Sequence, residues 1–204
     1  TKAVRRLLLA TTNPGKLREF RRLLDGCGWE LVSPSDLDLA IEVAEEGDRY
    51  EVNALAKATA WAEAAGLTAL ADDSGIEVDA LGGRPGVHSA RYGGAGLDDA
   101  GRTLLLLREL ATVPDDRRTA RYRAVVAIAV PPQSPVLSPQ PFSGTQEGRI
   151  AHAPRGCGGF GYDPVFLLAD GRTQAEISDG EKDAISHRGQ AMRLAAVWLR
   201  EHAG

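Results

Sequence analysis

The sequence contains only two cysteines and no long hydrophobic run. Cys27 and Cys157 do not have the spacing of a metal site, and two cysteines are too few for a disulfide framework. We therefore expect a reducing, cytoplasmic environment. The apolar residues that follow Lys2, Arg5 and Arg6 near the N-terminus are too few for a signal peptide. No other apolar run is long enough to predict a membrane span.

The chain also lacks an excess of basic residues. Its 204 residues include 24 Lys and Arg against 28 Asp and Glu, which gives a formal net charge of −4. This balance argues against a broad surface for nucleic acid or anionic membranes, but it leaves room for a small basic pocket. The chain has no internal repeat and no linker that would separate two independent domains. We therefore expect one domain over residues 1–204, with 43% hydrophobic residues available for its core.

Strand and helix patterns alternate in the first half of the chain, and long strands dominate its middle. Apolar or alternating runs predict strands over residues 4–11, 29–33, 68–71, 118–130, 143–153 and 163–169. Helical spacing predicts helices from residue 17 up to Gly26, over 48–65 and 97–111, and from residue 178 onward. Residues 131–141 hold five prolines and predict a surface loop or hairpin tip. This order indicates an α/β fold with a mixed sheet.

Two of these helices carry further signals. Gly66 predicts the end of the 48–65 helix, and Ser178 with Glu181 has the spacing of a capping box. The apolar side chains expected to face the core are Val52, Leu55, Ala56, Thr59 and Ala62 in the first helix, and Ala191, Leu194, Ala195, Val197, Trp198 and Leu199 in the second.

The segment between the first strand and the first helix suits an anion. Asn13 is a typical helix cap, and Pro14 is typical of the first helical position. A helix N-terminus presents unpaired N–H groups and a partial positive charge, and Lys16 adds a cation there. The segment is not a Walker A loop, because the glycine spacing is absent. Helix capping and phosphate binding are compatible, since both use the same end of the helix.

Two adjacent carboxylates follow the predicted strand 68–71. Asp72 and Asp73 precede Ser74 and Gly75, which predict a turn. Neighbouring side chains of an extended segment point to opposite faces, so the two acids are expected to have different roles. Carboxylates at the end of a strand serve as metal ligands or general bases, although an Asp-rich turn with a satisfied side chain is the structural alternative.

The 48–65 helix places two polar residues on one face. Asn53 and Lys57 are four residues apart, so their side chains are neighbours. Glu45 and Glu46 belong to an acidic segment just before this helix, and most such segments are solvated. Lys57 becomes a candidate site residue only if its face meets the segment that contains Lys16.

The glycine-rich segment 155–164, RGCGGFGYDP, combines two aromatic residues with an acid. Phe160 and Tyr162 have rings that suit stacking on a base, and Asp163 is an acceptor for a base N–H. The alternative is that the aromatic rings fill the core. Further on, Lys182 and the run Ser186-His187-Arg188 supply donors. Donors that converge on a purine favour a 6-keto group over a 6-amino group, although this run also fits a capped helix start.

Taken in order, these segments resemble the inosine/xanthosine triphosphate pyrophosphatase family, which removes non-canonical purine nucleotides from the nucleotide pool. The matching pieces are LLLATTNPGKLREF, Glu45-Glu46-Gly47 with Asn53 and Lys57, ALADDSGIEVDALGGRPGVHSARY, GRI with RGCGGFGYDPVF, and EKDAISHRGQA. They extend from Leu7 to Ala191, which is nearly the whole chain.

The resemblance implies both a fold and a reaction. The fold is a long, mixed, twisted α/β sheet flanked by helices, with two lobes around a central nucleotide cleft, usually as a homodimer. The reaction converts a nucleoside triphosphate and water to the monophosphate and pyrophosphate. The implied substrates are ITP, dITP and XTP, and the implied cofactor is Mg²⁺.

The resemblance also assigns roles to residues. The triphosphate is assigned to Thr11, Thr12, Asn13, Pro14, Gly15 and Lys16, with Lys57 as a second cation. Asp73 is assigned as general base and metal contact, Glu45 as second metal ligand with Glu46 as its alternative, and Ser74 as a substrate contact. The base pocket is assigned to Phe160, Gly161, Tyr162, Asp163, Lys182, His187 and Arg188. The chain departs from the family pattern at Val52, where an acid often precedes the Asn, and at Cys157, where a small hydroxyl residue is usual.

Three other functions agree less well with the sequence. A related pyrophosphatase for pyrimidine or modified nucleotides lacks support from the SHR and FGYD segments. A nucleotide-binding regulator without turnover has no need of Asp73 as a base. An RNA-binding module disagrees with the net charge of −4 and the absence of a basic stripe.

Overall fold

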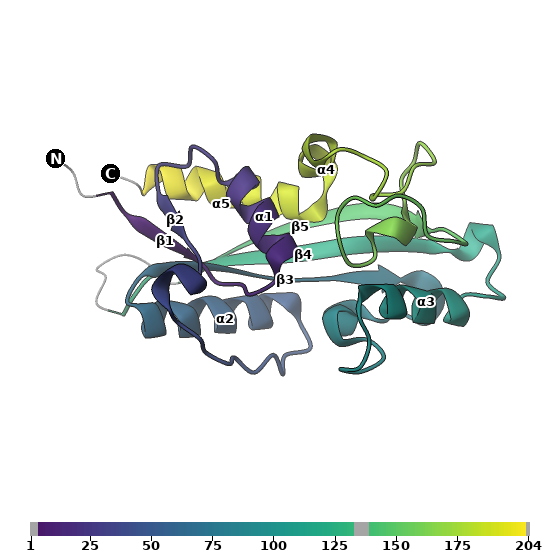
Figure 1. Ribbon diagram of the computed structural model, residues 1–204, viewed down its shortest axis with the longest axis horizontal. Helices are drawn as coiled ribbons and strands as arrows, with labels where there is room; N and C mark the ends of the chain where they lie inside the picture. Colours follow the sequence, from purple (N-terminus) through teal and green to yellow (C-terminus); the bar gives the residue numbers. More distant parts are fainter. Residues whose placement is uncertain (1–3, 133–138, 203–204) are drawn as a thin grey trace. The chain divides into compact units, whose positions relative to one another are not determined.

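The computed structural model describes residues 4–132 and 139–202 (Figure 1). Six strands form one sheet in the order β2-β1-β3-β4-β5-β6. Parallel pairs join β1 to β2 and to β3, and an antiparallel pair joins β5 to β6, so the sheet is mixed, as predicted. Residues 133–138 of the predicted proline-rich loop lie outside the described residues. Within the described ranges, no helix combines the length and apolar character that a membrane span requires.

The chain divides into two compact units. Unit 1 comprises residues 1–73, 124–144 and 188–204, and unit 2 comprises residues 74–123 and 145–187. The strands β3, β4 and β5 each contribute one part to each unit, and each unit has its own hydrophobic cluster. The predicted cleft between two lobes stays a prediction.

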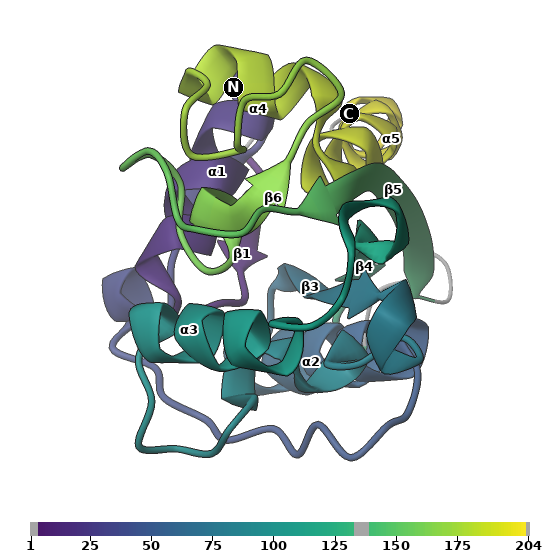
Figure 2. The ribbon, with the colours of Figure 1, turned by 90° about the vertical axis from the view of Figure 1, so that its right-hand side faces the viewer.

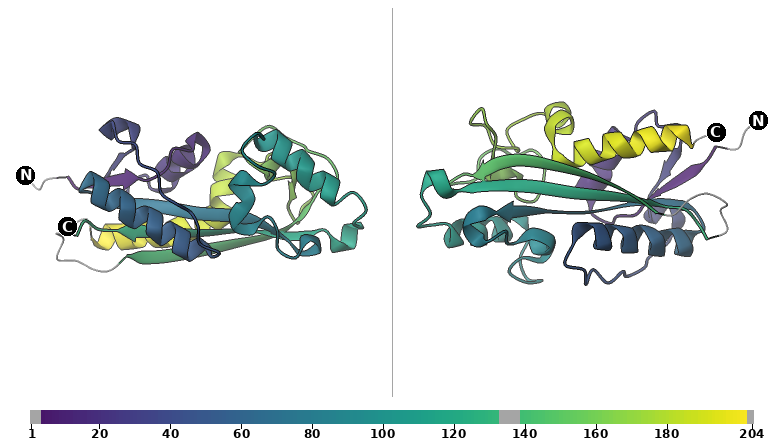
Figure 3. Two further views of the ribbon diagram at one scale, coloured as in Figure 1. Left: turned by 90° about the horizontal axis from the view of Figure 1, so that it is seen from below. Right: turned by 180° about the vertical axis from the view of Figure 1, so that it is seen from behind.

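Unit 1 contains the parallel part of the sheet. Its elements are β1 (Arg6–Leu9), α1 (Pro14–Leu23), β2 (Glu30–Val32), a 3₁₀ turn (Ser35–Leu37), α2 (Tyr50–Ala65), part of β3 (Thr68–Val78), part of β4 (Thr119–Ala129), part of β5 (Gln140–Ile150), and α5 (His187–Glu201) from its second residue onward. Helices α1 and α5 cover one face of these strands, and α2 covers the other (Figures 1 and 3). In β1 three consecutive leucines, Leu7, Leu8 and Leu9, follow the exposed Arg6, and all three are fully buried, as in a strand covered on both faces.

The helix ends in unit 1 follow the sequence signals. Asn13 caps α1, since its side chain accepts a hydrogen bond from the Lys16 N–H, and Pro14 is the first helical residue. Gly66 ends α2 in the left-handed conformation at φ 62°. Both predictions are confirmed.

The predicted core faces of α2 and α5 are partly wrong. Val52 on α2 is 46% exposed, and Leu194 and Val197 on α5 are 53% and 45% exposed. The buried residues of α2 are Tyr50, Asn53, Ala54, Ala58, Trp61 and Ala62. Alanines lie almost all around α2, and in α5 large apolar residues stand on the exposed side as well as on the buried one, so apolar spacing alone did not identify the side that packs.

Unit 2 contains the remaining parts of β3, β4 and β5 with shorter elements. These are 3₁₀ turns over Asp79–Leu81, Gly86–Arg91, Asp115–Arg117 and Asp163–Val165, the helices α3 (Asp99–Glu109) and α4 (Asp179–Ile185), and the strand β6 (Phe166–Leu167). Strand β6 lies beside β5, with Ile150 opposite Phe166 (Figure 2). The predicted strand 163–169 is therefore short, because Asp163 and Pro164 begin a 3₁₀ turn.

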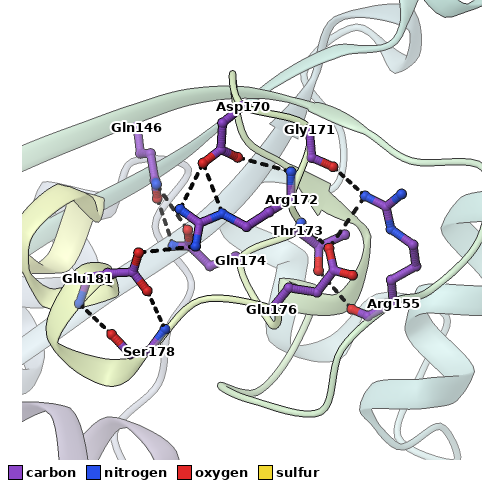
Figure 4. A network of polar contacts seen from close by, with 10 residues as sticks. All are labelled: Gln146, Arg155, Asp170, Gly171, Arg172, Thr173, Gln174, Glu176, Ser178 and Glu181. Carbon is purple, nitrogen blue, oxygen red and sulfur yellow. Dashed lines mark hydrogen bonds and ion pairs between the residues drawn. The ribbon is translucent and has the colours of Figure 1, made fainter.

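A polar network holds the segment between β6 and α4 (Figure 4). Arg172 contacts Asp170 and also Glu181, whose side chain and the Ser178 hydroxyl form the predicted capping box of α4. Gln146 and Gln174 form a reciprocal amide pair with N–O distances of 3.0 and 2.8 Å. Arg172 thereby links α4 to the segment before it, and the amide pair links that segment to β5.

Strand β3 does not end at the two acids. It continues through Asp72, Asp73, Ser74 and Gly75 to Val78, so the predicted turn is wrong. The continuation is possible because apolar Ile76 and Val78 follow in alternation and are buried. The two carboxylates therefore lie in mid-strand, where their backbone is held by the sheet.

At Gly75 the neighbouring segment packs so closely against β3 that there is no room for a side chain. A Cβ there would lie 2.1 Å from the Gly86 carbonyl oxygen and 2.7 Å from the Ser89 hydroxyl. We expect Gly75→Ala to destabilise the protein by about 1–3 kcal/mol, since a backbone carbonyl cannot shift cheaply. Thermal unfolding measures this as a melting temperature lowered by several degrees.

The control is Gly96→Ala, at an exposed glycine where an added Cβ meets no heavy atom of the described residues within 4 Å. Equal melting temperatures for the two variants would contradict the steric account of Gly75.

Candidate active site

The segment before α1 exposes donors at the helix N-terminus. The Asn13 side chain accepts from Lys16 N at 3.1 Å, and Asn13 N donates to the Thr11 hydroxyl at 3.1 Å. Within residues 4–132 and 139–202, the backbone N–H groups of Thr12 and Gly15 have no hydrogen-bond partner. Such groups at a helix N-terminus suit an anion. The predicted phosphate segment therefore has the right local geometry.

A chain of buried ion pairs runs beside this segment in unit 1. The Lys16 ammonium lies 2.8 Å from Asp72 Oδ1, and Arg188 Nε lies 3.1 Å from Asp72 Oδ2. Arg188 Nη1 in turn lies 2.7 Å from Glu19 Oε2. Asp72 is 2% exposed and Arg188 is 3% exposed. One carboxylate of β3 thus binds cations from α1 and α5.

The pKa values reflect this pairing. Burial raises the pKa of Asp72, but the attraction of Lys16 and Arg188 outweighs it and holds the pKa well below the usual range. Burial lowers the pKa of Lys16, and Asp72 only partly offsets this. Asp72 is therefore a charged structural partner at neutral pH and a poor proton acceptor.

Asp73 has a separate set of partners. Asn53 Nδ2 donates to Asp73 Oδ2 at 2.9 Å, and the Lys57 ammonium lies 3.9 Å from Asp73 Oδ1. The same ammonium lies 3.3 Å from Glu45 Oε1. Asp72 and Asp73 have different partners among these contacts, as expected for neighbouring side chains of a strand, and their separate roles stay a prediction. Lys57 faces the acids, not solvent.

Burial raises the pKa of Asp73, with Lys57 and Asn53 opposing the shift. A carboxylate with a raised pKa accepts a proton more readily than a solvated one. In contrast to Asp72, this acid has the properties of a general base.

The pair Asp73 and Glu45 also fits a divalent cation. The Lys57 ammonium lies within 4 Å of both carboxylates, so the two acids come near the same point of unit 1. Mg²⁺ is commonly held by one or two carboxylates together with substrate phosphates. No group of three or more His, Cys, Asp or Glu side chains that suits a metal occurs in the part of the chain that the structure describes. The donor set is therefore one that suits a metal shared with a phosphate ligand.

A second polar group lies in unit 2 and centres on Asp163. The Lys182 ammonium lies 2.5 Å from Asp163 Oδ2, which also accepts from the Phe160 N–H at 3.0 Å. The Tyr122 hydroxyl donates to Asp163 Oδ1 at 3.0 Å. Lys182 also lies 4.9 Å from the centre of the Phe160 ring, in cation–π geometry.

Tyr122 links this group to His187. The two rings stack with centroids 4.5 Å apart and an interplanar angle of 10°. His187 is 3% exposed. A flat aromatic pair, a lysine and a carboxylate therefore come together from β4, α4, the start of α5 and the glycine-rich segment.

The glycine-rich segment folds closely around Asp163. A Cβ at Gly159 would lie 2.0 Å from Asp163 Oδ2, so only glycine allows this approach. Gly161 N donates to Asp99 Oδ2 at 2.9 Å. The Tyr162 ring belongs to the hydrophobic cluster of unit 2, and its hydroxyl donates to Ser89 O at 2.7 Å. For Tyr162 the alternative of a ring that fills the core is the correct one.

The structure thus gathers the predicted residues into two groups. The unit 1 group holds residues 11–16, Lys57, Asp73, Glu45 and Arg188. The unit 2 group holds residues 160–163, Lys182 and His187. Ser74 is a half-buried residue of unit 2 in mid-strand β3. Arg188, predicted for the base pocket, has Asp72 and Glu19 as partners.

Three residues of these groups were not predicted as site residues. Asn53 and Glu19 lie within segments that carry the family resemblance but have no role assigned there, and Tyr122 lies outside those segments. Glu19 lies on α1 among apolar positions and is 4% exposed, and Tyr122 lies within a long strand. The sequence did contain one signal for such residues, which is a polar side chain at a position where the helix or strand pattern predicts burial.

Replacing Asp72 tests the ion-pair chain. Asp72→Asn leaves Lys16 and Arg188 without their shared carboxylate, and we expect a loss of about 3 kcal/mol of stability near pH 7. Folding lowers the pKa of this group, so its stabilisation is complete above the unfolded-state value of 3.8 and declines as the pH falls below it. The stability difference between wild type and variant should shrink by on the order of 1 kcal/mol between about pH 6 and about pH 3.

Thermal or urea unfolding at both pH values measures this difference. The exposed Asp116→Asn serves as a control that should match wild type throughout. A difference that stays constant with pH would show that the charge of Asp72 contributes nothing.

The comparisons with known proteins cover almost the whole chain. A model of the Ham1 family matches residues 7–198. The dITP/XTP pyrophosphatase of Symbiobacterium thermophilum is 55% identical over 92% of this chain and 91% of its own. The dITP/XTP pyrophosphatase of Geobacter sulfurreducens is 47% identical over 98% of this chain and 96% of its own.

A solved structure shows the same fold. The HAM1 protein of Coxiella burnetii superposes with a TM-score of 0.85 at 38% identity, over 97% of this chain and 100% of its own. The matching family model, the identities above 30% and the shared fold agree along nearly the full length. The chain belongs to the Ham1 family.

Proposed function

We propose that this protein hydrolyses the non-canonical purine nucleotides ITP, dITP and XTP to the monophosphate and pyrophosphate. The observation that carries the proposal is the 47–55% identity, over more than nine-tenths of this chain, to proteins named dITP/XTP pyrophosphatase. The two polar groups of the structure supply the chemistry that such a substrate needs, because one suits phosphates and the other suits a base.

The unit 1 group binds the triphosphate. The N–H groups of Thr12 and Gly15 and the ammonium groups of Lys16 and Lys57 neutralise its charge. A pyrophosphate leaving group needs such neutralisation in the transition state. Lys16 and Lys57 are held by Asp72, Glu45 and Asp73, so little reorganisation is needed when the phosphates bind.

Asp73 acts as the general base in this proposal. It accepts a proton from the water that attacks the α-phosphorus, and its raised pKa suits that role. Asp73 and Glu45 would hold Mg²⁺, with Glu46 as the alternative to Glu45. When bound, the ion supplies charge neutralisation for the phosphates.

The unit 2 group binds the base. Lys182 and His187 supply donors for a 6-keto group, and Phe160 offers a partly exposed ring beside Lys182. Tyr162 anchors the glycine-rich segment to the core of unit 2, and Asp163 holds Lys182. Ser74 contacts substrate. Arg188 is kept as a base-pocket residue, although its buried pairs with Asp72 and Glu19 make its substitution a poor test of specificity, because stability would fall as well.

The same resemblance underlies two further proposals. The protein is cytoplasmic, as expected for a nucleotide-pool enzyme with unpaired cysteines. It forms a homodimer, which light scattering of the purified protein would check.

A substrate panel tests the function. Pyrophosphate release is measured from ITP, XTP, dITP, GTP, ATP and dTTP, with Mg²⁺ and with a chelator. We expect Mg²⁺-dependent release confined to ITP, dITP and XTP. Preference for dTTP would agree with pyrophosphatase chemistry but contradict the assigned specificity for purines. Binding of ITP without release of pyrophosphate would indicate a nucleotide-binding protein that is not an enzyme.

Substitution of the proposed base adds a residue-level test. Asp73→Asn should lower kcat about 10²–10⁴-fold while ITP still binds. Thermal stability at neutral pH should be kept or raised, since folding raises the pKa of this carboxyl and its charge therefore opposes folding. The exposed Asp116→Asn is the matched control and should retain wild-type rates. Near-normal turnover in Asp73→Asn would refute the role of Asp73 as the general base.

Tyr122→Phe tests the unit 2 group by removing one oxygen atom, that of the Tyr122 hydroxyl. The variant keeps the ring that stacks on His187 and loses the hydroxyl that donates to Asp163. We expect the ratio of kcat/KM for ITP over GTP to fall about tenfold, because Lys182 then has a less constrained carboxylate partner.

Tyr92→Phe is the control, since Tyr92 also donates to a carboxylate, that of Glu109, outside this group. Equal selectivity ratios for both variants and wild type would exclude Tyr122 from base discrimination.

A further inference from the structure

The side-chain amide of Asn53 lies where three segments of unit 1 meet. It belongs to α2, is 2% exposed, and contacts both β3 and the residues before α2. Its Nδ2 donates to Asp73 Oδ2 at 2.9 Å and to Gly47 O at 3.2 Å. Its Oδ1 accepts from Gly47 N at 2.9 Å. Both Nδ2 hydrogens and the Oδ1 oxygen of Asn53 therefore have hydrogen-bond partners.

Gly47 fixes which way this amide points. Its backbone offers one donor and one acceptor, so Asn53 satisfies both only with Oδ1 toward the N–H and Nδ2 toward the carbonyl. This orientation leaves the second Nδ2 hydrogen for Asp73. The reversed amide would place the single Oδ1 against both the Gly47 carbonyl and the Asp73 carboxylate, and its NH2 group against the Gly47 N–H, which is repulsive.

The close approach also requires glycine at position 47. A Cβ there would lie 2.5 Å from Asn53 Oδ1 and 3.0 Å from Val52 Cγ1. Glu45 is two residues away, and its carboxylate contacts Lys57, which follows Asn53 by four residues along α2. Helix α2 thus reaches both carboxylates that are proposed to hold the metal.

We propose that Asn53 is a positioning residue that orients Asp73 and, through Gly47, anchors the segment carrying Glu45, so that the two carboxylates are arranged in advance for a divalent cation. The inference rests on the proposed function, since it assigns Asp73 and Glu45 to the metal. Asn53 itself contacts neither metal nor substrate in this role. Partners that orient a ligating carboxylate commonly contribute about 10–100-fold to metal affinity or activity.

The first test uses Asn53→Ala and Mn²⁺ as the probe. Binding of Mn²⁺ alone, followed by the loss of the free-ion paramagnetic resonance signal, should weaken about 10–100-fold. In turnover of ITP, kcat should fall by a similar factor, and the Mg²⁺ concentration for half-maximal rate should rise. KM for ITP at saturating Mg²⁺ should stay within about threefold, because the triphosphate contacts of residues 11–16 are unchanged.

The matched control is Gln146→Ala. It removes a buried amide that is also paired on both sides, with Gln174 in unit 2, as Figure 4 shows. It should lower the melting temperature much as Asn53→Ala does and leave Mn²⁺ binding unchanged. This control separates the loss of a buried amide from the loss of carboxylate orientation.

The second test uses Gly47→Ala, which displaces the amide without altering it. It should show the same change in Mn²⁺ affinity. The double variant Gly47→Ala/Asn53→Ala should be no worse than the weaker-binding single variant, since both act through one contact and their effects are not additive.

Mn²⁺ binding equal to wild type in folded Asn53→Ala and Gly47→Ala would overturn the inference. Additive losses in the double variant would also overturn it. These results differ from a failure of the proposed function, in which the wild-type protein itself releases no pyrophosphate from ITP. If neither single variant folds, their melting curves show it, and Asn53→Asp then provides the test. That variant keeps the acceptor for Gly47 N, replaces the donor to Asp73 with a like charge, and should weaken Mn²⁺ binding if the inference holds.

Discussion

Unit 1 depends on the neutralisation of one buried carboxylate. Asp72 lies in mid-strand at 2% exposure, where an isolated charge would be strongly disfavoured. Lys16 from α1 and Arg188 from α5 resolve this by contacting its two oxygens, and Glu19 balances the second cation. Removing either cation would leave charge uncompensated in the interior, so the strand and both helices are linked by one electrostatic requirement.

The neighbouring acid shows how one strand supports two kinds of carboxylate. The alternation of β3 sends Asp72 toward two cations and Asp73 toward Asn53 and Lys57. Strong pairing lowers the pKa of the first, while burial raises that of the second. A structural anion and a proton acceptor therefore arise from adjacent residues, because the side chains around each differ in charge.

Unit 2 reaches a comparable arrangement with fewer charges. Asp163 accepts from Lys182, Tyr122 and a backbone N–H, and the glycines beside it permit the backbone to come close. Lys182 belongs to α4, whose first turn is held by the Ser178–Glu181 capping box and by the contact of Glu181 with Arg172, so it is held from its own helix as well as by its carboxylate partner. Specificity that depends on such groups is sensitive to small displacements, since a lysine ammonium and a base edge must meet at hydrogen-bond distance.

The sequence by itself determined the α/β class, most helix and strand positions, the caps at Asn13, Gly66 and Ser178, and the family, because these depend on local residue order. It also identified Lys16, Lys57, Asp73 and Lys182 as candidates. Only the tertiary structure decided that β3 runs through the two acids, that Arg188 pairs with Asp72 and Glu19, and that Asn53 and Tyr122 contact Asp73 and Asp163. These contacts join residues 20 to 169 positions apart, and local propensity has no information about such pairs.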